Sequence, residues 1–284
     1  MSFESIVEKY GARLIAWNKT WKSPFQDVRY VEALAEYYDL RGGIVKIAPS
    51  VLDGVIGYRI LAWKVPYKYI ASNISSELGD EVISRIKKSA LIKELTAYLE
   101  IPVDKFKPFL KISTMHAYTL VIPLQRPLQY IWHDFSKSLR REINISERKG
   151  VKVRRAKPHE GYELYRGIAL EKGLIVRPLE LLNILSEKGL LRCYTATLNG
   201  SILASLFVLC TNKVTTYWLG GYHKKYSKYY PHSLCFWYAI RESRERGADI
   251  FDMGGIEYPP TKHAIFKYKF GGFIIRLYRL KVFV

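Results

Sequence analysis

The hydrophobic positions between residues 158 and 255 change period along the chain. Apolar residues recur at helical spacing over 158–173 and 177–189, form three strand-like runs over 191–222, and return to helical spacing over 231–247. Asn199-Gly200 and residues 211–213 interrupt the strand-like runs, as hairpin turns do. The pattern predicts two helices, an antiparallel meander of three strands, a third helix, and a final strand over 248–255.

The first half of the chain shows a similar order of elements. Residues 27–40 have helical spacing, 42–70 predict two or three strands, and 75–101 predict a helix. A strand over 116–124, a long helix over 128–150 that ends at Gly150, and a strand over 151–156 follow. We therefore predict a mixed α/β (α+β) chain of two halves that share the order of their elements but no residue-level repeat.

Composition limits the class of protein and its partners. The 284 residues are 49% hydrophobic, which supports a packed core and excludes wholesale disorder. The formal net charge of +19 favours nucleic acid, anionic lipid head groups or phosphorylated small molecules as partners, or it reflects the composition of the source proteome. No apolar run approaches about 18 residues, so we expect no integral membrane segment. The three cysteines have no metal-ligand spacing and favour a reducing, cytoplasmic setting.

Four segments resemble one known family. The meander followed by a helix and a splayed strand is similar to GCN5-related N-acyltransferases (GNAT). The finer match is to the FemABX peptidyltransferase-like family, and it rests on "SPFQDVRYVEAL", "FSKSLRREINISERKGVKVRRA", "YYPHSLCFWYAIRESRERGADIFDMGGI" and "FKYKFGG". These segments occur in family order over nearly the whole chain.

The resemblance implies a fold and a reaction class. It implies two tandem GNAT-like domains with mixed, mostly antiparallel sheets flanked by helices. Residues 1–133 would form a degenerate first domain, 134–273 the domain with the active site, and 274–284 a strand that returns to the first domain. The best-known members transfer an amino acid from aminoacyl-tRNA to an amine. The resemblance therefore implies an amide-forming acyltransferase that uses aminoacyl-tRNA or another phosphate-bearing donor and no cofactor.

The segment 251–272 holds the catalytic candidates. Asp252 ends a predicted strand, and Gly254 and Gly255 allow close approach of a ligand to the backbone. Lys267 falls where the resemblance implies a lysine that binds phosphate or the developing oxyanion. Asp252 and Glu257 are candidate bases, and His232 and His263 are further candidates for the same role. A tight strand exit, and a strand whose Lys267 and Lys269 face solvent, are the structural alternatives.

Two basic segments, residues 137–157 and 217–230, hold most of the candidates for substrate binding. Lys137 and Arg141, four residues apart, share a helix face, whereas Arg140 is expected to diverge from Arg141 by about 100°. Further candidates are Tyr217, Lys224 and Lys225 in the aromatic and basic segment 217–230, and Lys269. A solvated helix face and a surface loop remain the alternatives for these two segments.

The donor is the open choice. An acyl-CoA enzyme normally places a glycine-rich loop before the helix at 231, but no glycine occurs between Gly221 and Gly247. The sequence therefore favours an aminoacyl donor over acetyl-CoA or acyl-CoA. An acyl-CoA-dependent N-acyltransferase of the same fold and a non-catalytic basic RNA-binding module are the alternative functions.

Overall fold

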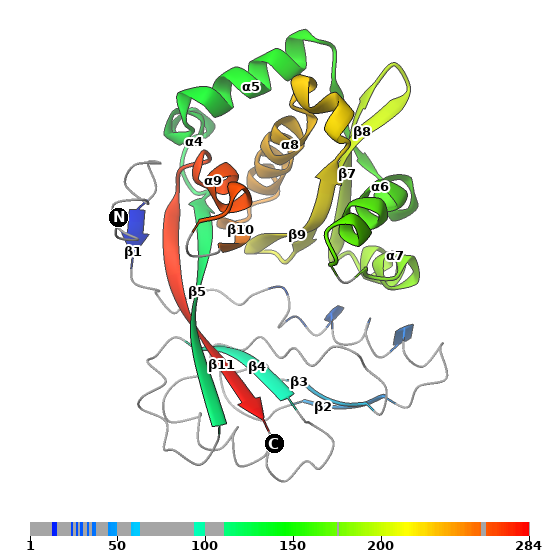
Figure 1. Ribbon diagram of the computed structural model, residues 1–284, viewed down its shortest axis with the longest axis vertical. Helices are drawn as coiled ribbons and strands as arrows, with labels where there is room; N and C mark the ends of the chain where they lie inside the picture. Colours follow the sequence, from blue (N-terminus) through cyan, green and yellow to red (C-terminus); the bar gives the residue numbers. More distant parts are fainter. Residues whose placement is uncertain are drawn as a thin grey trace. The chain divides into compact units, whose positions relative to one another are not determined.

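The computed structural model (Figure 1) divides into two compact units. The first comprises Met1–Ile15 and Thr119–Ile274, and the second comprises Ala16–Tyr118 and Ile275–Val284. The residues that the structure describes are 13–15, 24, 27, 29–30, 33, 36–37, 45–49, 58–62, 94–99, 111–174, 176–256 and 260–283.

A mixed sheet forms the centre of the first unit, and two of its strands continue into residues of the second unit. Its strands lie in the order β1 (Arg13–Ile15), β11 (Phe273–Phe283), β5 (Lys111–Pro123), β10 (Ile250–Ile256), β9 (Val214–Tyr222), β8 (Ser201–Cys210), β7 (Leu191–Leu198) and β6 (Lys152–Ala156). Strands β6 to β9 pair antiparallel, and β10 pairs parallel to β9. The predicted meander is confirmed, and the mostly antiparallel α/β architecture agrees with the sequence.

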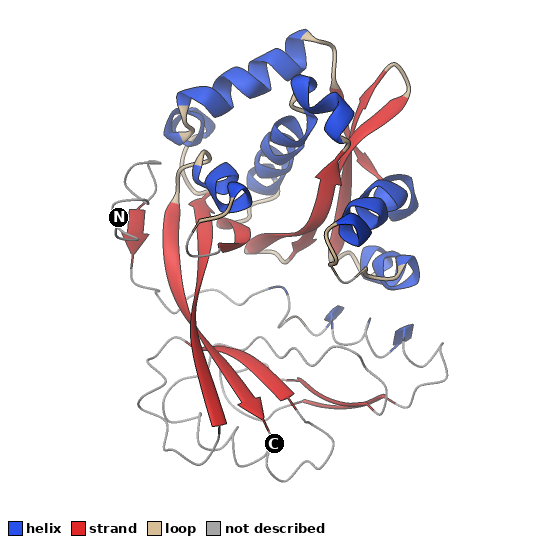
Figure 2. Ribbon diagram, viewed as in Figure 1, coloured by secondary structure: helices blue, strands red, loops and turns tan. Residues whose placement is uncertain are grey.

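Helices cover both faces of strands β7 to β9 (Figure 2). Helix α6 (Pro158–Glu171) packs so closely on one face that a Cβ at Gly161 would lie 3.0 Å from the Cys193 sulfur. The neighbouring Tyr194 points to the opposite face, where its ring lies 5.7 Å from that of Tyr238 in α8 (Pro231–Glu245). Helix α7 (Leu179–Glu187) packs beside α6. All three cysteines are free and buried, as small core residues are.

The predicted long helix over 128–150 is two helices, α4 (Leu128–Asp134) and α5 (Lys137–Arg148). The break lies at Phe135, whose backbone is extended and whose buried ring packs against Trp132, Trp237 and Phe270. Ser136 then caps α5, because its Oγ accepts a hydrogen bond from the Leu139 amide at 3.2 Å. Aromatic packing at Phe135 thus overrides the continuous helical pattern of the sequence.

The strand expected around Lys267 and Lys269 is wrong, since residues Lys262–Tyr268 form helix α9. Thr261 caps the helix by accepting a hydrogen bond from the Ala264 amide at 3.3 Å. Ala264, Lys267 and Tyr268 are buried, which is the spacing of one helix face rather than the alternation of a strand.

The second unit contains two strand pairs. Strands β2 (Val45–Pro49) and β3 (Tyr58–Ala62) pair antiparallel, as the hairpin-like sequence predicts. Strand β4 (Glu94–Leu99) pairs antiparallel with β11 from Tyr278 to Phe283, so the helix predicted over 75–101 is wrong at these residues. The tandem GNAT-like domains, with their boundaries at 133 and 273, stay a prediction. Among the described residues, no helix combines the length and apolar character needed to cross a bilayer.

Candidate functional site

The parallel pairing of β9 and β10 ends partway along both strands. The last paired residues are Thr216 and Asp252, although β9 continues to Tyr222 and β10 to Ile256. Next to this point β9 has a bulge against β8, because Val208 pairs with Tyr217 and Phe207 with Leu219, which leaves Trp218 as an extra residue. Beyond Thr216 and Asp252, the backbones of β9 and β10 therefore no longer pair with each other and can contact other groups.

Lys267 reaches this point from α9. Its side chain is only 3% exposed, and its Nζ donates a hydrogen bond to the Gly255 carbonyl at 2.7 Å. The same Nζ lies 5.5 Å from the centroid of the Tyr217 ring, a cation–π contact. The ammonium group thus contacts the ends of both β9 and β10 where their pairing stops.

Gly254 makes this approach possible. Its φ of +75° lies in the left-handed region, and a Cβ there would lie 3.2 Å from the Tyr217 carbonyl oxygen and 3.7 Å from the Lys267 Nζ. A role of Gly254 in the close approach of a ligand stays a prediction. The group that approaches is the lysine of the chain itself.

Asp252 fixes the turn that follows it. Its Oδ1 accepts hydrogen bonds from the Thr119 hydroxyl and from the Gly254 amide, the latter at 2.8 Å. Burial raises the pKa of Asp252, while the bonds from Thr119 and Gly254 and the charge of Lys267 oppose that rise. Asp252 therefore holds the Gly254 backbone beside Lys267.

A cluster of rings surrounds the lysine. Tyr217 packs edge-on against Phe236 at 4.8 Å, and His232 stacks on Phe266 at 5.6 Å with an interplanar angle of 10°. Burial, assisted by the charges of His263, Lys172 and Lys267, lowers the pKa of His232 to about 3. His232 is therefore neutral at physiological pH, and its Nε2 has no hydrogen-bond partner within the described part of the chain.

Lys269 is held by an acid that the sequence analysis did not single out. Its Nζ lies 2.7 Å from Oε1 of Glu142 in α5, and the other oxygen of Glu142 accepts a hydrogen bond from Ser233 at 2.8 Å. The Lys269 carbonyl also accepts a hydrogen bond from the Ser136 amide at 2.7 Å. Lys269 and Glu142 thus join the end of α9 to α5 and α8.

The basic residues of α5 line an open hollow on the surface. Lys137, Arg141 and Arg148 are exposed, and Arg140 is partly held by a 2.9 Å bond from its guanidinium to the His133 carbonyl. Arg140 and Arg141 are consecutive in a regular α-helix and therefore diverge, but the hollow is wide enough that both line it. Its lining is Lys137, Arg140, Arg141, Asn144, Glu147 and Arg148.

The segment before α8 is a 3₁₀ helix, η3 (Lys224–Tyr229). Lys224 forms an ion pair with Glu171 of α6, and the Lys225 ammonium lies 4.8 Å from the Tyr226 ring. At the far end of α5, the Lys149 Nζ donates to the Lys228 carbonyl at 2.9 Å, so η3 adjoins the basic helix. The three lysines of η3 are all exposed.

Sequence reasoning finds most of this site but not all of it. Asp252, Gly254, Gly255, Tyr217 and Lys267 lie together, whereas Glu257 lies outside the described residues. Thr119 was missed, although a threonine inside the apolar strand "HAYTLVIPL" is a visible signal.

Known proteins resemble both the segment that carries the site and the fold of the chain. Residues 179–269, from α7 to the end of α9, match the model of the acetyltransferase (GNAT) domain family. A search of curated proteins finds no match.

Solved structures show the same fold. FemX is 14% identical with a TM-score of 0.64, covering 91% of this chain and 96% of its own. The L-PGS from Bacillus licheniformis is 16% identical with a TM-score of 0.58, covering 88% and 91%. The C-terminal domain of a putative lysylphosphatidylglycerol synthetase from Agrobacterium fabrum is 13% identical with a TM-score of 0.56, covering 91% and 92%.

These findings confirm the predicted GNAT-like fold and the resemblance to FemABX proteins at the level of structure. The segment 179–269, which carries Lys267 and Asp252, is the part that also matches an acetyltransferase (GNAT) domain in sequence.

Proposed function

We propose that this protein is an acyltransferase that takes an aminoacyl group from aminoacyl-tRNA and transfers it to an amine, forming an amide. The observation that carries the proposal is the structure of residues 223–231. In an acyl-CoA enzyme this loop supplies free backbone N–H groups to a pyrophosphate. Here the Tyr226 amide donates to His223 and the Tyr230 amide to Ser227, and Pro231 has no N–H. At these three positions no backbone N–H is free, which supports a donor other than CoA.

The cations around this loop support a nucleic-acid donor. Lys225 and Lys228 of η3 are exposed beside the rings of Tyr226 and Tyr229, an arrangement that suits phosphates and stacked bases. The Lys149–Lys228 contact joins η3 to α5, whose exposed face carries Lys137, Arg141 and Arg148. Phosphates along a tRNA acceptor stem would neutralise such a surface.

The Lys267 ammonium supplies the charge that acyl transfer needs. The acceptor nitrogen attacks the carbonyl carbon of the aminoacyl ester, and the carbonyl oxygen becomes an oxyanion that the ammonium group stabilises. The new C–N bond is kept when the intermediate collapses, and the ester C–O bond breaks. The ribose oxygen leaves with the bonding electron pair and receives the proton that the amine loses. In this reaction Asp252 acts as a positioning residue, since its bonds to Thr119 and Gly254 fix the backbone beside Lys267.

Donor binding tests the proposal directly. The purified protein is titrated with charged tRNA, with the same tRNA after deacylation, and with acetyl-CoA, each at two salt concentrations. We expect charged tRNA to bind more tightly than deacylated tRNA, and both affinities to fall steeply with salt. Saturable binding of acetyl-CoA without discrimination between the two tRNAs would instead establish the acyl-CoA enzyme of the same fold. Equal binding of both tRNAs without transfer would establish an RNA-binding module.

A further inference from the structure

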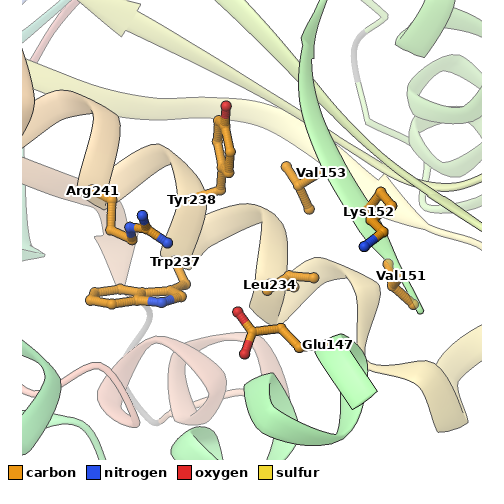
Figure 3. A pocket seen from close by; sticks show the side chains of 8 residues that line it. All are labelled: Glu147, Val151, Lys152, Val153, Leu234, Trp237, Tyr238 and Arg241. Atoms are coloured by element: carbon orange, nitrogen blue, oxygen red, sulfur yellow. The ribbon is translucent and has the colours of Figure 1, made fainter. Parts of the chain in front are cut away.

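A second pocket is lined by one face of α8 (Figure 3). It has a volume of about 200 Å³ and is formed by the end of α5, the start of β6 and one face of α8. Its α8 residues are Leu234, Trp237, Tyr238 and Arg241, at helical spacing three and four apart. His232 and Phe236, which belong to the ring cluster at Lys267, lie on the opposite face of the helix. The pocket is therefore separate from the proposed transfer site.

The wall of the pocket is apolar. Val151, Leu234 and Trp237 are 3%, 6% and 8% exposed, and Val153 completes this surface. The Trp237 ring also packs against Trp132 and Phe135, at 5.1 and 5.3 Å between centroids. The indole is thus fixed in place, and a ligand with an apolar side chain would find a rigid wall.

Three charged side chains of mixed sign surround this apolar wall. In Figure 3 the charged ends of Glu147, Lys152 and Arg241 turn toward the space between them. All three are exposed, and none forms an ion pair within the described part of the chain. The Arg241 guanidinium instead lies 5.9 Å from the centroid of the Trp237 ring. Opposite charges that line one pocket without pairing leave places for both an anionic and a cationic group of one ligand.

We propose that this pocket binds a free α-amino acid with an apolar side chain. Arg241 would bind the carboxylate, Glu147 would bind the ammonium group, and the side chain would pack on Val151, Val153 and Leu234. Glu147 repels a ligand that carries only negative charge, and the two cations repel one that carries only positive charge. The zwitterion is the chemical class that satisfies both Arg241 and Glu147, and the volume suits one amino acid of about the size of leucine.

Calorimetric titration with L-leucine tests the site on the full chain. We expect one molecule to bind per chain. L-leucinamide lacks the carboxylate and N-acetyl-L-leucine lacks the ammonium group, so each should bind at least about tenfold more weakly. Glycine lacks the apolar side chain and should also bind at least about tenfold more weakly.

Variants locate the binding on the protein. Glu147→Gln and Arg241→Gln should each weaken leucine binding at least about tenfold. The control is Arg155→Gln, which removes an exposed cation of β6 that does not line the pocket and should leave the affinity unchanged.

Three results would overturn the proposal. The first is the absence of saturable leucine binding, and the second is binding that Glu147→Gln and Arg241→Gln both leave unchanged. The third is equal binding of leucine and its two blocked analogues. None of these results bears on the aminoacyl donor, because the pocket and the Lys267 site occupy opposite faces of α8.

Discussion

Replacing Lys267 with methionine separates the charge of this residue from its packing. Methionine keeps a long unbranched side chain that fills the same buried space between α9 and the strand ends. It removes the ammonium group, and with it the 2.7 Å bond to the Gly255 carbonyl and the contact with the Tyr217 ring. The variant therefore tests what the positive charge does.

The expected effect on folding is small. Gly255 is exposed, so water can replace the lysine at its carbonyl oxygen. A hydrogen bond to a charged group contributes about 1.5–3 kcal/mol, but removing a buried cation also removes the free energy needed to desolvate it. These opposing effects leave a change of about 1 kcal/mol in the free energy of unfolding.

The expected effect on transfer is much larger. Loss of one group that stabilises an oxyanion lowers kcat by about 10²–10³, which corresponds to about 2.7–4 kcal/mol. Transfer is measured by incubating tRNA charged with radiolabelled amino acids with the amine fraction of a cell extract. Radioactivity that survives alkali is counted, because alkali hydrolyses the ester of the donor but not the amide of the product.

The control variant is Lys213→Met. Lys213 is an exposed lysine of the β8–β9 hairpin that pairs with Asp249 at 3.1 Å, at the opposite end of β9 from Tyr222. This variant should transfer at the wild-type rate. A Lys267→Met protein that unfolds like the wild type and transfers at the same rate would refute the role of the lysine in stabilising the oxyanion.

Three further predictions address other parts of the structure. The pKa of His232 is about 3 in the folded protein and about 6.5 in the unfolded chain. Between these pH values only the unfolded chain takes up a proton, so the stability that is present above about pH 6.5 is lost as pH falls toward 3. Relative to His232→Phe, the wild type should lose about 3 kcal/mol of stability between neutral pH and about pH 4 in urea denaturation, and parallel pH profiles would contradict this. Gly220→Ala should lower the free energy of unfolding by about 1–3 kcal/mol, because its φ is +151° and its Cβ would lie 2.5 Å from a carbonyl oxygen of β8. Gly200→Ala, at a φ of +78° with open space around it, should lower the free energy of unfolding by less. An equal loss in both variants would show that the protein relieves the close contact at position 220. Replacing Lys137 and Arg141 together with glutamine should reduce the salt slope of tRNA binding by about 1–2, whereas an unchanged slope in filter binding would place the tRNA elsewhere.

Local sequence signals predict the meander well because each hairpin carries its own turn residues. Asn199 and Gly200 have φ values of 49° and 78°, as a two-residue hairpin turn with both central residues left-handed requires. Helix α9 was not predicted, because "FKYKF" alternates like a strand over only five residues. The helical pattern becomes visible only when Ala264 and the Thr261 cap are read together with Lys267.

The contacts that complete the site could not be predicted from local patterns. Thr119 and Asp252 are 133 residues apart in sequence, and Glu142 and Lys269 are 127 apart. Each pair depends on strands and helices that meet only in the folded chain. The resemblance to FemABX proteins pointed to Asp252 and Lys267, but it did not indicate which groups hold them in position.

The burial of Lys267 is itself an argument for function. A buried cation costs free energy, and apolar residues of similar size often replace buried ion pairs without loss of stability. This lysine lies at the place where β9 and β10 stop pairing, beside the Gly255 carbonyl, the Tyr217 ring and Asp252. These groups are not needed to complete the sheet, because the pairing of β9 with β10 already ends at Thr216 and Asp252. A charge kept at such a point is what the proposed acyl transfer requires, because a negative charge develops on the carbonyl oxygen during that reaction.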